Sequence, residues 1–452
     1  MGSVFKRVLR RWRAIKAGSR DEETSLQIEP LGFWPERNSA ILDDHSGEPS
    51  PIEGYAFHTR YVPSTGGRIS FEICFAGLTA TYGHLLVSIN GLDPDGQPLA
   101  PRIERYSIRQ LLDADGKIEV GTTALYDNSY AVMGTLVDSD ARADHIVVHV
   151  KGADSDDAYI ARVEAAQRGF LSVPGEGDLA DIIVNRRATL AEPISQMCTA
   201  FQMQEKIYWK LCRWMKEAPK QHRKQWEFIY IIRSLDYHGA LRKGARGLGF
   251  GVGVEPLTSL FAEAGCTITA TDLHMEDVRS RVWSRTQQLG ADLQKIFHPR
   301  LCNEARFLSN VSFRPVDMNA IPDDLTGFDF TWSSCAYEHL GSIEAGLAFF
   351  ENSLKCLKPG GLAVHTTELN LSSNDSTLDR GNTVLFRRRD FEELARRLTA
   401  QGHKVVPITF DTGDHELDRI IDLPPYSNDP HLKLALMRWV STSFGMTVRK
   451  GG

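Results

Sequence analysis

The spacing of apolar and polar residues divides the chain into four stretches, of which 51–170 has a β pattern. Short runs rich in β-branched and aromatic residues, such as RISFEICFAG and DHIVVHVKG, alternate there with turn clusters such as DPDGQ. Runs of this kind, with no helical spacing between them, predict an all-β sandwich. The stretch contains no cluster of residues typical of catalysis. Packing, oligomerisation or holding part of a substrate, such as a glycan, are its candidate roles.

Helical spacing replaces the β pattern over 171–240. Apolar residues recur at helical spacing in ISQMCTAFQMQEKIYWKLCRWMKE and QWEFIYIIRSLDYHG, and they include three tryptophans. Such a stripe predicts helices that pack on a core. We expect a helical connector between two domains, and a lid over a substrate is the alternative interpretation.

Strands and helices alternate over 241–452. The expected strands are ARGLGFG, TITATDL, VSFRPVDM, FDFTWSS and LAVHTTEL, with HKVVPITF and STSFGMTVRK as closing strands. The expected helices are PLTSLFAEAG, IEAGLAFFENSLKCLKPGG and RRRDFEELARRLTAQG, each ended by glycine, and most of 275–308. The alternation predicts an α/β doubly wound, mostly parallel sheet, with a ligand at the carboxyl ends of its strands.

The first stretch, 1–50, differs from the rest. Residues 4–16 place apolar side chains on one helical face and six Lys and Arg on the other. A basic amphipathic helix of this kind predicts peripheral contact with an anionic membrane, and a helix packed on the protein is the alternative. The polar residues that follow are expected to form a linker. The sequence has neither a run of about 18 apolar residues for a membrane span nor the apolar core of a secretory signal.

Composition narrows the classes of function. Hydrophobic residues make up 42% of the 452 residues and charged residues 24%, which is typical of a soluble globular protein. The net charge of −6 gives no reason to expect nucleic-acid binding. The seven cysteines are scattered without a C-x-x-C pair. We therefore expect reduced thiols in a cytoplasmic protein rather than disulfides or a zinc site. The oligomeric state stays open.

The run GARGLGFGVGVEP carries four glycines on alternate positions. They are Gly247, Gly249, Gly251 and Gly253. Because glycine costs about 0.5–1 kcal/mol in regular structure, we expect a ligand pressed against this main chain. A dinucleotide would require G-x-G-x-x-G, but the third glycine position holds Val254, Val252 or Pro256 in the three registers. S-adenosylmethionine, which carries no phosphate, is the remaining class of cofactor.

Acidic residues stand at the ends of the next two predicted strands. Asp272 ends TITATDL, where a carboxylate can accept hydrogen bonds from both ribose hydroxyls. Asp317 ends VSFRPVDM, where it can accept from the adenine amino group, and Met318 can pack on the ring. The candidate cofactor-binding residues are Gly247, Gly249, Phe250, Gly251, Gly253, Asp272, Leu273, Asp317, Met318 and Ser333.

These motifs, in this order, resemble the class I S-adenosylmethionine-dependent methyltransferases over about residues 240–450. The resemblance rests on GLGFGVG, TATDL, PVDM, FDFTWSS and LKPGGLAVHTTE. More narrowly, the stretch looks like methyltransferases found with enzymes of bacterial surface-polysaccharide and O-antigen biosynthesis. The family usually has an acidic residue at the position of Gly247, which helps to hold the methionine end of the cofactor. Glu255 can compensate for it or cap the following helix.

The resemblance implies methyl transfer near the ends of the fourth and fifth strands. Glu338 and His339 follow the fourth strand, and the fifth ends with His365 and Glu368. In one interpretation, His339 or His365 takes a hydroxyl proton and a carboxylate orients it. In another, the four residues bind a divalent metal such as Mg²⁺, as in O-methyltransferases that carry E-x-x-E-H, although Cys335 replaces the first Glu. In a third, the Glu-His pair only caps a helix or borders the cofactor.

The expected function is O-methylation of a sugar hydroxyl in a bacterial surface glycan or its lipid-linked precursor, at the inner face of the cytoplasmic membrane. The basic run 387–389 and the loop DLPPYSNDPHLKLAL are candidates for holding the acceptor. A small-molecule acceptor that is not a sugar is one alternative. A noncatalytic scaffold that binds S-adenosylmethionine is the other, and Gly247 favours it.

Overall fold

The computed structural model describes residues 25–42, 47–94, 96–126, 128–274, 290, 292–424, 426–427 and 429–452. The amphipathic segment 4–16 lies outside these residues. Contacts along the chain define two compact units. Unit 1 comprises the chain to Gly91 with Pro98–Ser155, and unit 2 comprises Leu92–Gln97 with Asp156–Gly452. The stretch 171–240, expected to connect two domains, thus packs within the same unit as the strands that follow it.

Unit 1 consists of two antiparallel sheets with one shared apolar core. The first has the order β1 (Leu26–Ile28), β9 (His145–Lys151), β4 (Gly67–Ala76), β7 (Lys117–Ala124). The second has the order β2 (Tyr55–His58), β8 (Ser129–Val137), β5 (His84–Leu92), β6 (Arg102–Ser107), with β3 (Val62–Pro63) beside β8 and helix α2 (Ile108–Asp113) after β6. Alternate residues of β4, such as Ile69, Phe71 and Ile73, are fully buried, as the period of a strand requires.

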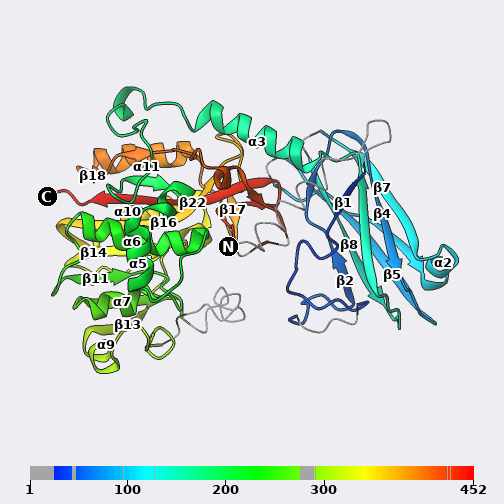
Figure 1. Ribbon diagram of the computed structural model, residues 1–452, viewed down its shortest axis with the longest axis horizontal. Coiled ribbons are helices and arrows are strands. Elements are labelled where there is room, and N and C mark those ends of the chain that lie inside the picture. Colours follow the sequence, from blue (N-terminus) through cyan, green and yellow to red (C-terminus); the bar gives the residue numbers. More distant parts are fainter. Residues whose placement is uncertain are drawn as a thin grey trace. The chain divides into compact units, whose positions relative to one another are not determined.

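Unit 2 is built on a mixed sheet (Figure 1). Its order is β13 (Val311–Pro315), β12 (Thr267–Asp272), β11 (Arg246–Gly249), β14 (Phe328–Ser334), β16 (Leu357–Asn370), β22 (Trp439–Arg449), β10 (Ser195–Met197), β19 (Ile408–Thr409). The strands from β13 to β16 pair in parallel, as the alternating pattern predicted, and β22 is antiparallel to β16. Their carboxyl ends therefore meet at one edge of the sheet.

Several elements differ from the predicted ones. β10 lies in a stretch that was expected to be helical and pairs with β22. The run HKVVPITF forms two short strands, β18 (Lys404–Val405) and β19, because Pro407 between them has no N–H to donate. Between 292 and 303 the chain forms turns rather than the expected helix, before α9 (Glu304–Asn310). Short strands β15 (Gly341–Ser342), β17 (Arg380–Gly381), β20 (Ile421–Asp422) and β21 (Lys433–Leu436) complete the sheets.

Helices cover both faces of the unit 2 sheet. On one face lie α10 (Ile343–Lys355) and α11 (Arg388–Ala400), and on the other α5 (Lys206–Trp214), α6 (Arg223–Tyr237) and α7 (Leu257–Glu263). Within the described part of unit 2, the structure also has α3 (Asp156–Phe170), α4 (Ala200–Gln204) and the 3₁₀ turns 177–179, 337–339 and 416–419. Along β16, Ala363 joins the first core, whereas Leu362 and Val364 join the second. Such double burial explains the continuous apolar run of this strand.

All seven cysteines belong to the described residues, and none is paired with another. Among those same residues, no helix is both long enough and apolar enough to cross a lipid bilayer.

At two of the four alternating glycines, rings of the neighbouring strand fill the space that a side chain would need. A Cβ at Gly247 would lie 2.4 Å from the ring of Phe330, and one at Gly249 would lie 2.4 Å from the ring of Trp332. Both rings belong to β14, the neighbouring strand. The expectation that a ligand excludes side chains at Gly247 and Gly249 is therefore corrected. Gly251 and Gly253 differ, because they form the turn after β11 with φ of 54° and 52°.

Gly249→Ala is expected to destabilise the protein by about 1–3 kcal/mol, because the added methyl overlaps Trp332 and Val252 in a closed core. Urea unfolding monitored by tryptophan fluorescence measures the change. Gly169→Ala is the matched control, since a Cβ at Gly169 meets no atom within 4 Å. An equal, small effect of both substitutions would contradict the close packing of β11 on β14.

Candidate functional site

Asp272 ties the glycine turn to the end of β12. Its Oδ2 accepts hydrogen bonds from the main-chain N–H of Gly253 (3.1 Å) and of Gly290 (3.0 Å), and Oδ1 accepts from that of Leu273 (2.8 Å). Burial raises the pKa of this carboxyl, while the three amides favour its charged form. A carboxylate has about four acceptor positions, so capacity remains for a ligand hydroxyl.

The end of β13 also reaches the glycine turn. A Cβ at Gly251 would lie 3.4 Å from the sulfur of the buried Met318 and 2.9 Å from the Cβ of Ala336, which follows β14. Asp317, next to Met318, accepts a hydrogen bond from the main-chain N–H of Asn319 (2.9 Å). The structure thus brings Gly251, Asp272, Asp317 and Met318 to one edge of the sheet.

Two candidate cofactor residues turn their side chains away from this edge. The ring of Phe250 is fully buried and packs edge-on against Phe349 (5.2 Å between centroids). The hydroxyl of Ser333 is buried and hydrogen-bonds Nδ1 of His365 (2.8 Å). Only the main chain of these two residues remains near the glycine turn.

His365 lies in the core beneath the sheet. Besides its Nδ1 contact with Ser333, its Nε2 lies 3.1 Å from Oγ of Ser353, and two phenylalanine rings of α10 flank the imidazole. Burial lowers its pKa to about 3, so the ring is neutral. Successive residues of a strand face opposite sides, so His365 and Glu368, three positions apart, diverge. This environment favours a structural role for His365 over proton transfer.

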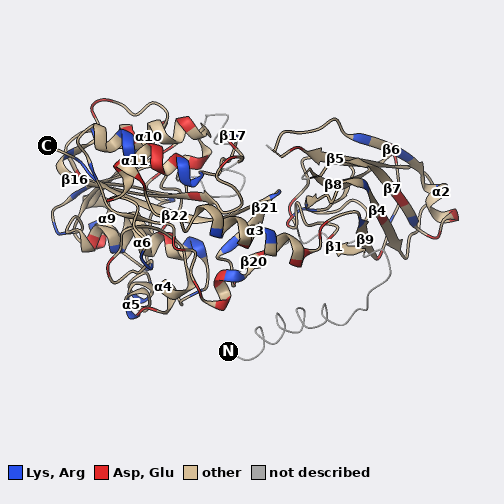
Figure 2. Cartoon of the chain, turned by 90° about the horizontal axis from the view of Figure 1, so that it is seen from above, with Lys and Arg blue, Asp and Glu red and all other residues tan. Residues whose placement is uncertain are grey.

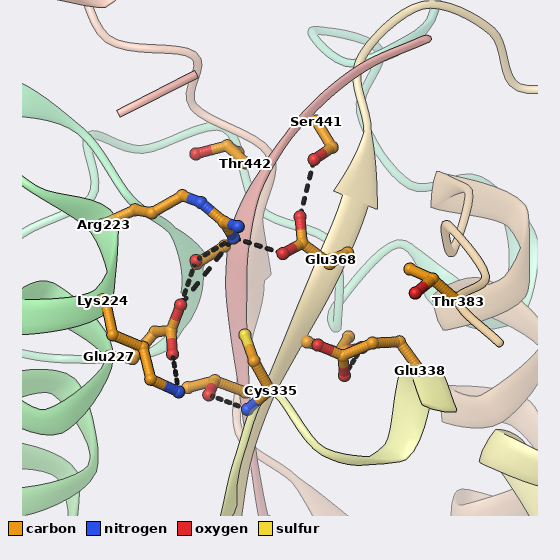
Figure 3. Close-up of polar contacts among 12 residues, drawn as sticks. Arg223, Lys224, Glu227, Cys335, Glu338, Glu368, Thr383, Ser441 and Thr442 are labelled. Carbon is orange, nitrogen blue, oxygen red and sulfur yellow. Dashed lines mark hydrogen bonds and ion pairs between the residues drawn. The ribbon is translucent and has the colours of Figure 1, made fainter. Parts of the chain in front are cut away.

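Charged side chains gather on the other face of β16, where α6 packs against the sheet. In Figure 3, Arg223, Lys224 and Glu227 point from α6 toward the ends of β14 and β16. Glu227, 1% exposed, accepts hydrogen bonds from Ser443 (2.6 Å) and Ser334 (3.1 Å) and pairs with Lys224 (3.1 Å). Arg223 hydrogen-bonds both Glu368 and Ser443. A buried charge network therefore lies under the carboxyl edge.

The network shifts the pKa values of two of its carboxyl groups in opposite directions. Burial acts to raise the pKa of Glu227, but Lys224 and Arg223 outweigh it and lower the pKa to about 2. Burial and the nearby Glu368 raise the pKa of Glu338 to about 8. Glu338 is 1% exposed, and its Oε2 accepts a hydrogen bond from Thr367 (2.9 Å). Perturbed carboxyls that lie this close together are typical of functional sites.

His339 stands beside Glu338 in the turn 337–339. Its Nδ1 lies 2.7 Å from the carbonyl oxygen of Asn382. Because a carbonyl can only accept, Nδ1 carries the proton and Nε2 of the neutral ring has the lone pair. Nε2 lies 3.9 Å from Oε1 of Glu338, and burial lowers the pKa of the imidazole. His339 is thus poised to accept a proton next to a carboxyl group.

Within the described part of the chain, the potential metal-ligand group is Cys335, Glu338 and Glu368, whose ligand atoms all lie within 4.8 Å of one another. His339 is not in the group. Burial and the surrounding carboxylates raise the pKa of the Cys335 thiol well above its usual value, and Arg223 already occupies Glu368. Mg²⁺ prefers oxygen ligands and needs them free, so these residues do not fit it.

The basic run 387–389 is engaged within the protein, where acidic and basic side chains alternate along α11 (Figure 2). Arg387 pairs with Asp390 (2.9 Å), and Arg389 pairs with Asp375 (3.2 Å). The buried Arg388 donates to the carbonyl groups of residues 170, 171, 173 and 174. The run therefore connects the start of α11 to residues 170–174 and to Asp375, and it does not form a basic surface patch that is free to bind a glycan.

The predicted acceptor loop lies against the start of α6. Asp422 and His431 form a buried pair, with Oδ2 and Nδ1 2.6 Å apart. The main-chain N–H of Arg223 donates to the carbonyl of His431 (2.9 Å). This contact places the loop beside the charge network and keeps it a candidate for acceptor binding.

The sequence pattern did not reveal the α6 residues Arg223, Lys224 and Glu227. A signal was present, because R-K-x-x-E at the start of an otherwise apolar helix puts opposite charges three and four positions apart. Such pairs usually lie on solvated surfaces, however. Only the position of α6 over β14 and β16 shows that Glu227 is buried here.

No protein-family model and no curated protein matches the chain. Among solved structures, the chain is similar to magnesium protoporphyrin IX methyltransferase (ChlM) from Synechocystis PCC 6803 with bound SAH, at 9% identity over 54% of this chain and 95% of that one, with a TM-score of 0.31. A putative sarcosine dimethylglycine methyltransferase from Galdieria sulphuraria is 16% identical over 50% and 85%, with a TM-score of 0.29. The glycopeptide N-methyltransferase MtfA is 12% identical over 48% and 94%, with a TM-score of 0.30. Likenesses this distant describe about half of the chain and say nothing of its substrate.

Proposed function

We propose that unit 2 is an S-adenosylmethionine-dependent methyltransferase that acts on a hydroxyl group. One observation carries the proposal. The positive-φ glycine turn, held by Asp272, lies at the carboxyl edge of parallel strands, and the His339–Glu338 pair follows the end of β14 at the same edge. Ligands of open α/β sheets bind at this edge. The arrangement supplies main chain for adenosine, a carboxylate for the ribose and a base for the acceptor.

The cofactor, when bound, supplies an electrophilic methyl group on a sulfonium. With the cofactor bound, an acceptor hydroxyl placed in line with its methyl group would be deprotonated by Nε2 of His339 as its oxygen attacks. Ionised Glu338, beside Nε2, stabilises the resulting imidazolium. Asn382 keeps Nδ1 protonated throughout, so Nε2 remains the basic atom.

The acceptor in this proposal is a sugar hydroxyl of a surface glycan or its lipid-linked precursor. Support comes from Thr383, whose hydroxyl lies 3.2 Å from Nδ1 of His339 and can hydrogen-bond an acceptor beside the proposed base (Figure 3). Membrane contact through residues 4–16 belongs to the same proposal. A noncatalytic scaffold is no longer favoured by Gly247, because Phe330 fills the space of a side chain there.

Calorimetry with S-adenosylhomocysteine tests the cofactor site. We expect saturable binding to one site per chain, and Asp272→Ala should weaken it about tenfold to hundredfold, because it removes a charged hydrogen-bond acceptor. Asp236→Ala is the control, since Asp236 is more than half exposed and pairs with Arg233 (2.9 Å) in the last turn of α6, whereas Lys224 lies in its first turn. Absence of binding by the wild-type protein would refute the proposal. Transfer of labelled methyl to glycan or small-molecule fractions then separates the classes of acceptor.

A further inference from the structure

Helix α5 presents a basic face to solvent. Lys206, Lys210 and Arg213 are exposed, and Trp209 among them is 48% exposed. Residues spaced three, four and seven positions apart share one face of a helix. The opposite face of α5 is buried in the core of unit 2, so its packing fixes which side chains point outward. The helix lies at an outer margin of that unit (Figure 2).

The charges on this face are not neutralised within the protein. Among the described residues, no carboxylate pairs with the three cations. The acidic residues that flank α5 make other contacts. Glu205 accepts hydrogen bonds from two main-chain N–H groups (2.6 and 2.8 Å), and Glu217 accepts one from Gln225 (2.8 Å). The positive charge of the face is therefore available to a partner outside the chain.

Two further cations extend the face beyond the end of α5. The exposed Lys216 donates through Nζ to the carbonyl of Arg300, and the exposed Arg300 donates to the carbonyl of Lys216 (3.4 Å). We call the whole set the α5 surface, which consists of Lys206, Trp209, Lys210, Arg213, Lys216 and Arg300.

We propose that the α5 surface binds the headgroups of an anionic lipid bilayer. Lys and Arg near such a bilayer are attracted to its negative surface potential, and an indole ring is stabilised at the level of the headgroups. The chain as a whole has a net charge of −6, so this attraction is confined to basic surfaces. Residues 4–16 combine Lys, Arg and Trp in the same way, and a second surface of this composition favours a bilayer over other polyanions.

The α5 surface is connected to the candidate site. The chain continues from α5 through residues 215–222 into the first turn of α6, which carries the charge network. In this connection, the N–H of Gln221 donates to Asp429 (3.2 Å), and its carbonyl accepts from the N–H of His431 (2.7 Å). Both partners belong to the predicted acceptor loop. A bilayer at the α5 surface would thus lie close to this loop, where a lipid-linked acceptor could enter. That consequence rests on the proposed function, whereas bilayer binding itself does not.

The test measures sedimentation of the full-length protein with vesicles of phosphatidylcholine, alone or mixed with phosphatidylglycerol. A variant that combines Lys206→Gln, Lys210→Gln and Arg213→Gln should bind the mixed vesicles about a hundredfold more weakly than the wild type. Each cation at an anionic surface contributes about fivefold to the partition coefficient. Residues 4–16 are the same in both proteins, so they do not account for a difference.

The matched control removes the same charge from the opposite edge of the sheet. It combines Lys243→Gln, Lys355→Gln and Lys404→Gln, three exposed cations that precede β11, end α10 and begin β18. Binding of this variant should equal that of the wild type. Brominated acyl chains, which quench tryptophans in contact with lipid, report on the contact itself. Trp209→Phe should lower the quenched fraction of the fluorescence of vesicle-bound protein.

Several results would overturn the inference. One is wild-type binding by the α5 variant, and another is an equal loss in the control, because net charge alone would then explain both. Unchanged quenching in Trp209→Phe would show that α5 does not touch the lipid. Binding of the wild type to a single-stranded oligonucleotide but not to mixed vesicles would assign the surface to nucleic acid instead. None of these results alters the binding of S-adenosylhomocysteine, which tests the proposed function separately.

Discussion

Glu227→Ala is expected to lower the free energy of unfolding by about 3–5 kcal/mol, the largest stability change among our predictions. Glu227 is almost fully buried, and it compensates Lys224 and Arg223 beneath the carboxyl edge of the sheet. Removal of this carboxylate leaves two cations and the hydroxyls of Ser334 and Ser443 without their common acceptor. Urea unfolding with two spectroscopic probes measures the loss, provided that both report one transition.

A matched exposed pair serves as the control. Glu263→Ala removes the half-exposed partner of Arg306 and should cost no more than about 1 kcal/mol. A loss of similar size for Glu227→Ala would contradict a buried network.

The pH dependence of stability gives a second check. Because the pKa of Glu227 is depressed to about 2, its contribution is present above its usual pKa of 4.5 and disappears as the pH falls toward 2. The gap between wild-type and variant should therefore narrow in acid.

His339→Ala is expected to reduce methyl transfer by about 10²–10⁴-fold, the usual contribution of a general base, while S-adenosylhomocysteine affinity stays unchanged. The tautomer set by Asn382 makes Nε2 the acceptor of the hydroxyl proton. Single-turnover measurements with labelled methyl groups separate this chemical step from binding and release.

His365 provides the contrasting variant. His365→Ala should lower stability, because it removes a buried ring and the hydrogen-bond partner of the buried Ser333 hydroxyl, but the folded fraction should keep its turnover. Unchanged turnover of His339→Ala would refute its role as base. Since ionised Glu338 stabilises the imidazolium and its pKa is about 8, turnover should rise with pH toward 8, and Glu338→Gln should abolish this rise.

Local sequence patterns were sufficient for the elements that depend on neighbours along the chain. The apolar runs predicted the parallel strands β11 to β16, and terminal glycines marked the ends of α7 and α11. The predicted site edge follows from the same pattern, because parallel strands place their carboxyl ends together. Glu338 and His339 were found in this way.

Patterns could not show which atoms fill the space around a residue. The alternation of glycines suggested a ligand, yet Phe330 and Trp332, about 80 residues later in the chain, occupy the space beside Gly247 and Gly249. From the strand HTTEL alone, His365 and Glu368 were likewise both candidate catalytic residues. The two side chains lie on opposite faces of the strand. They have different surroundings because α10 covers one face of the sheet and α6 covers the other.

The amino-acid sequence by itself thus determined the strand order along the chain, the tight turn at Gly251–Gly253 and the acidic end of β12, because backbone preference and burial period act over a few residues. Tertiary structure alone decided that Glu227 is buried against Arg223 and Lys224 and that Arg223 pairs with Glu368. The pKa of a charged group depends on how far it is buried and on the charges beside it. Packing determines both, and the neighbouring groups come from strands and helices far apart in the chain.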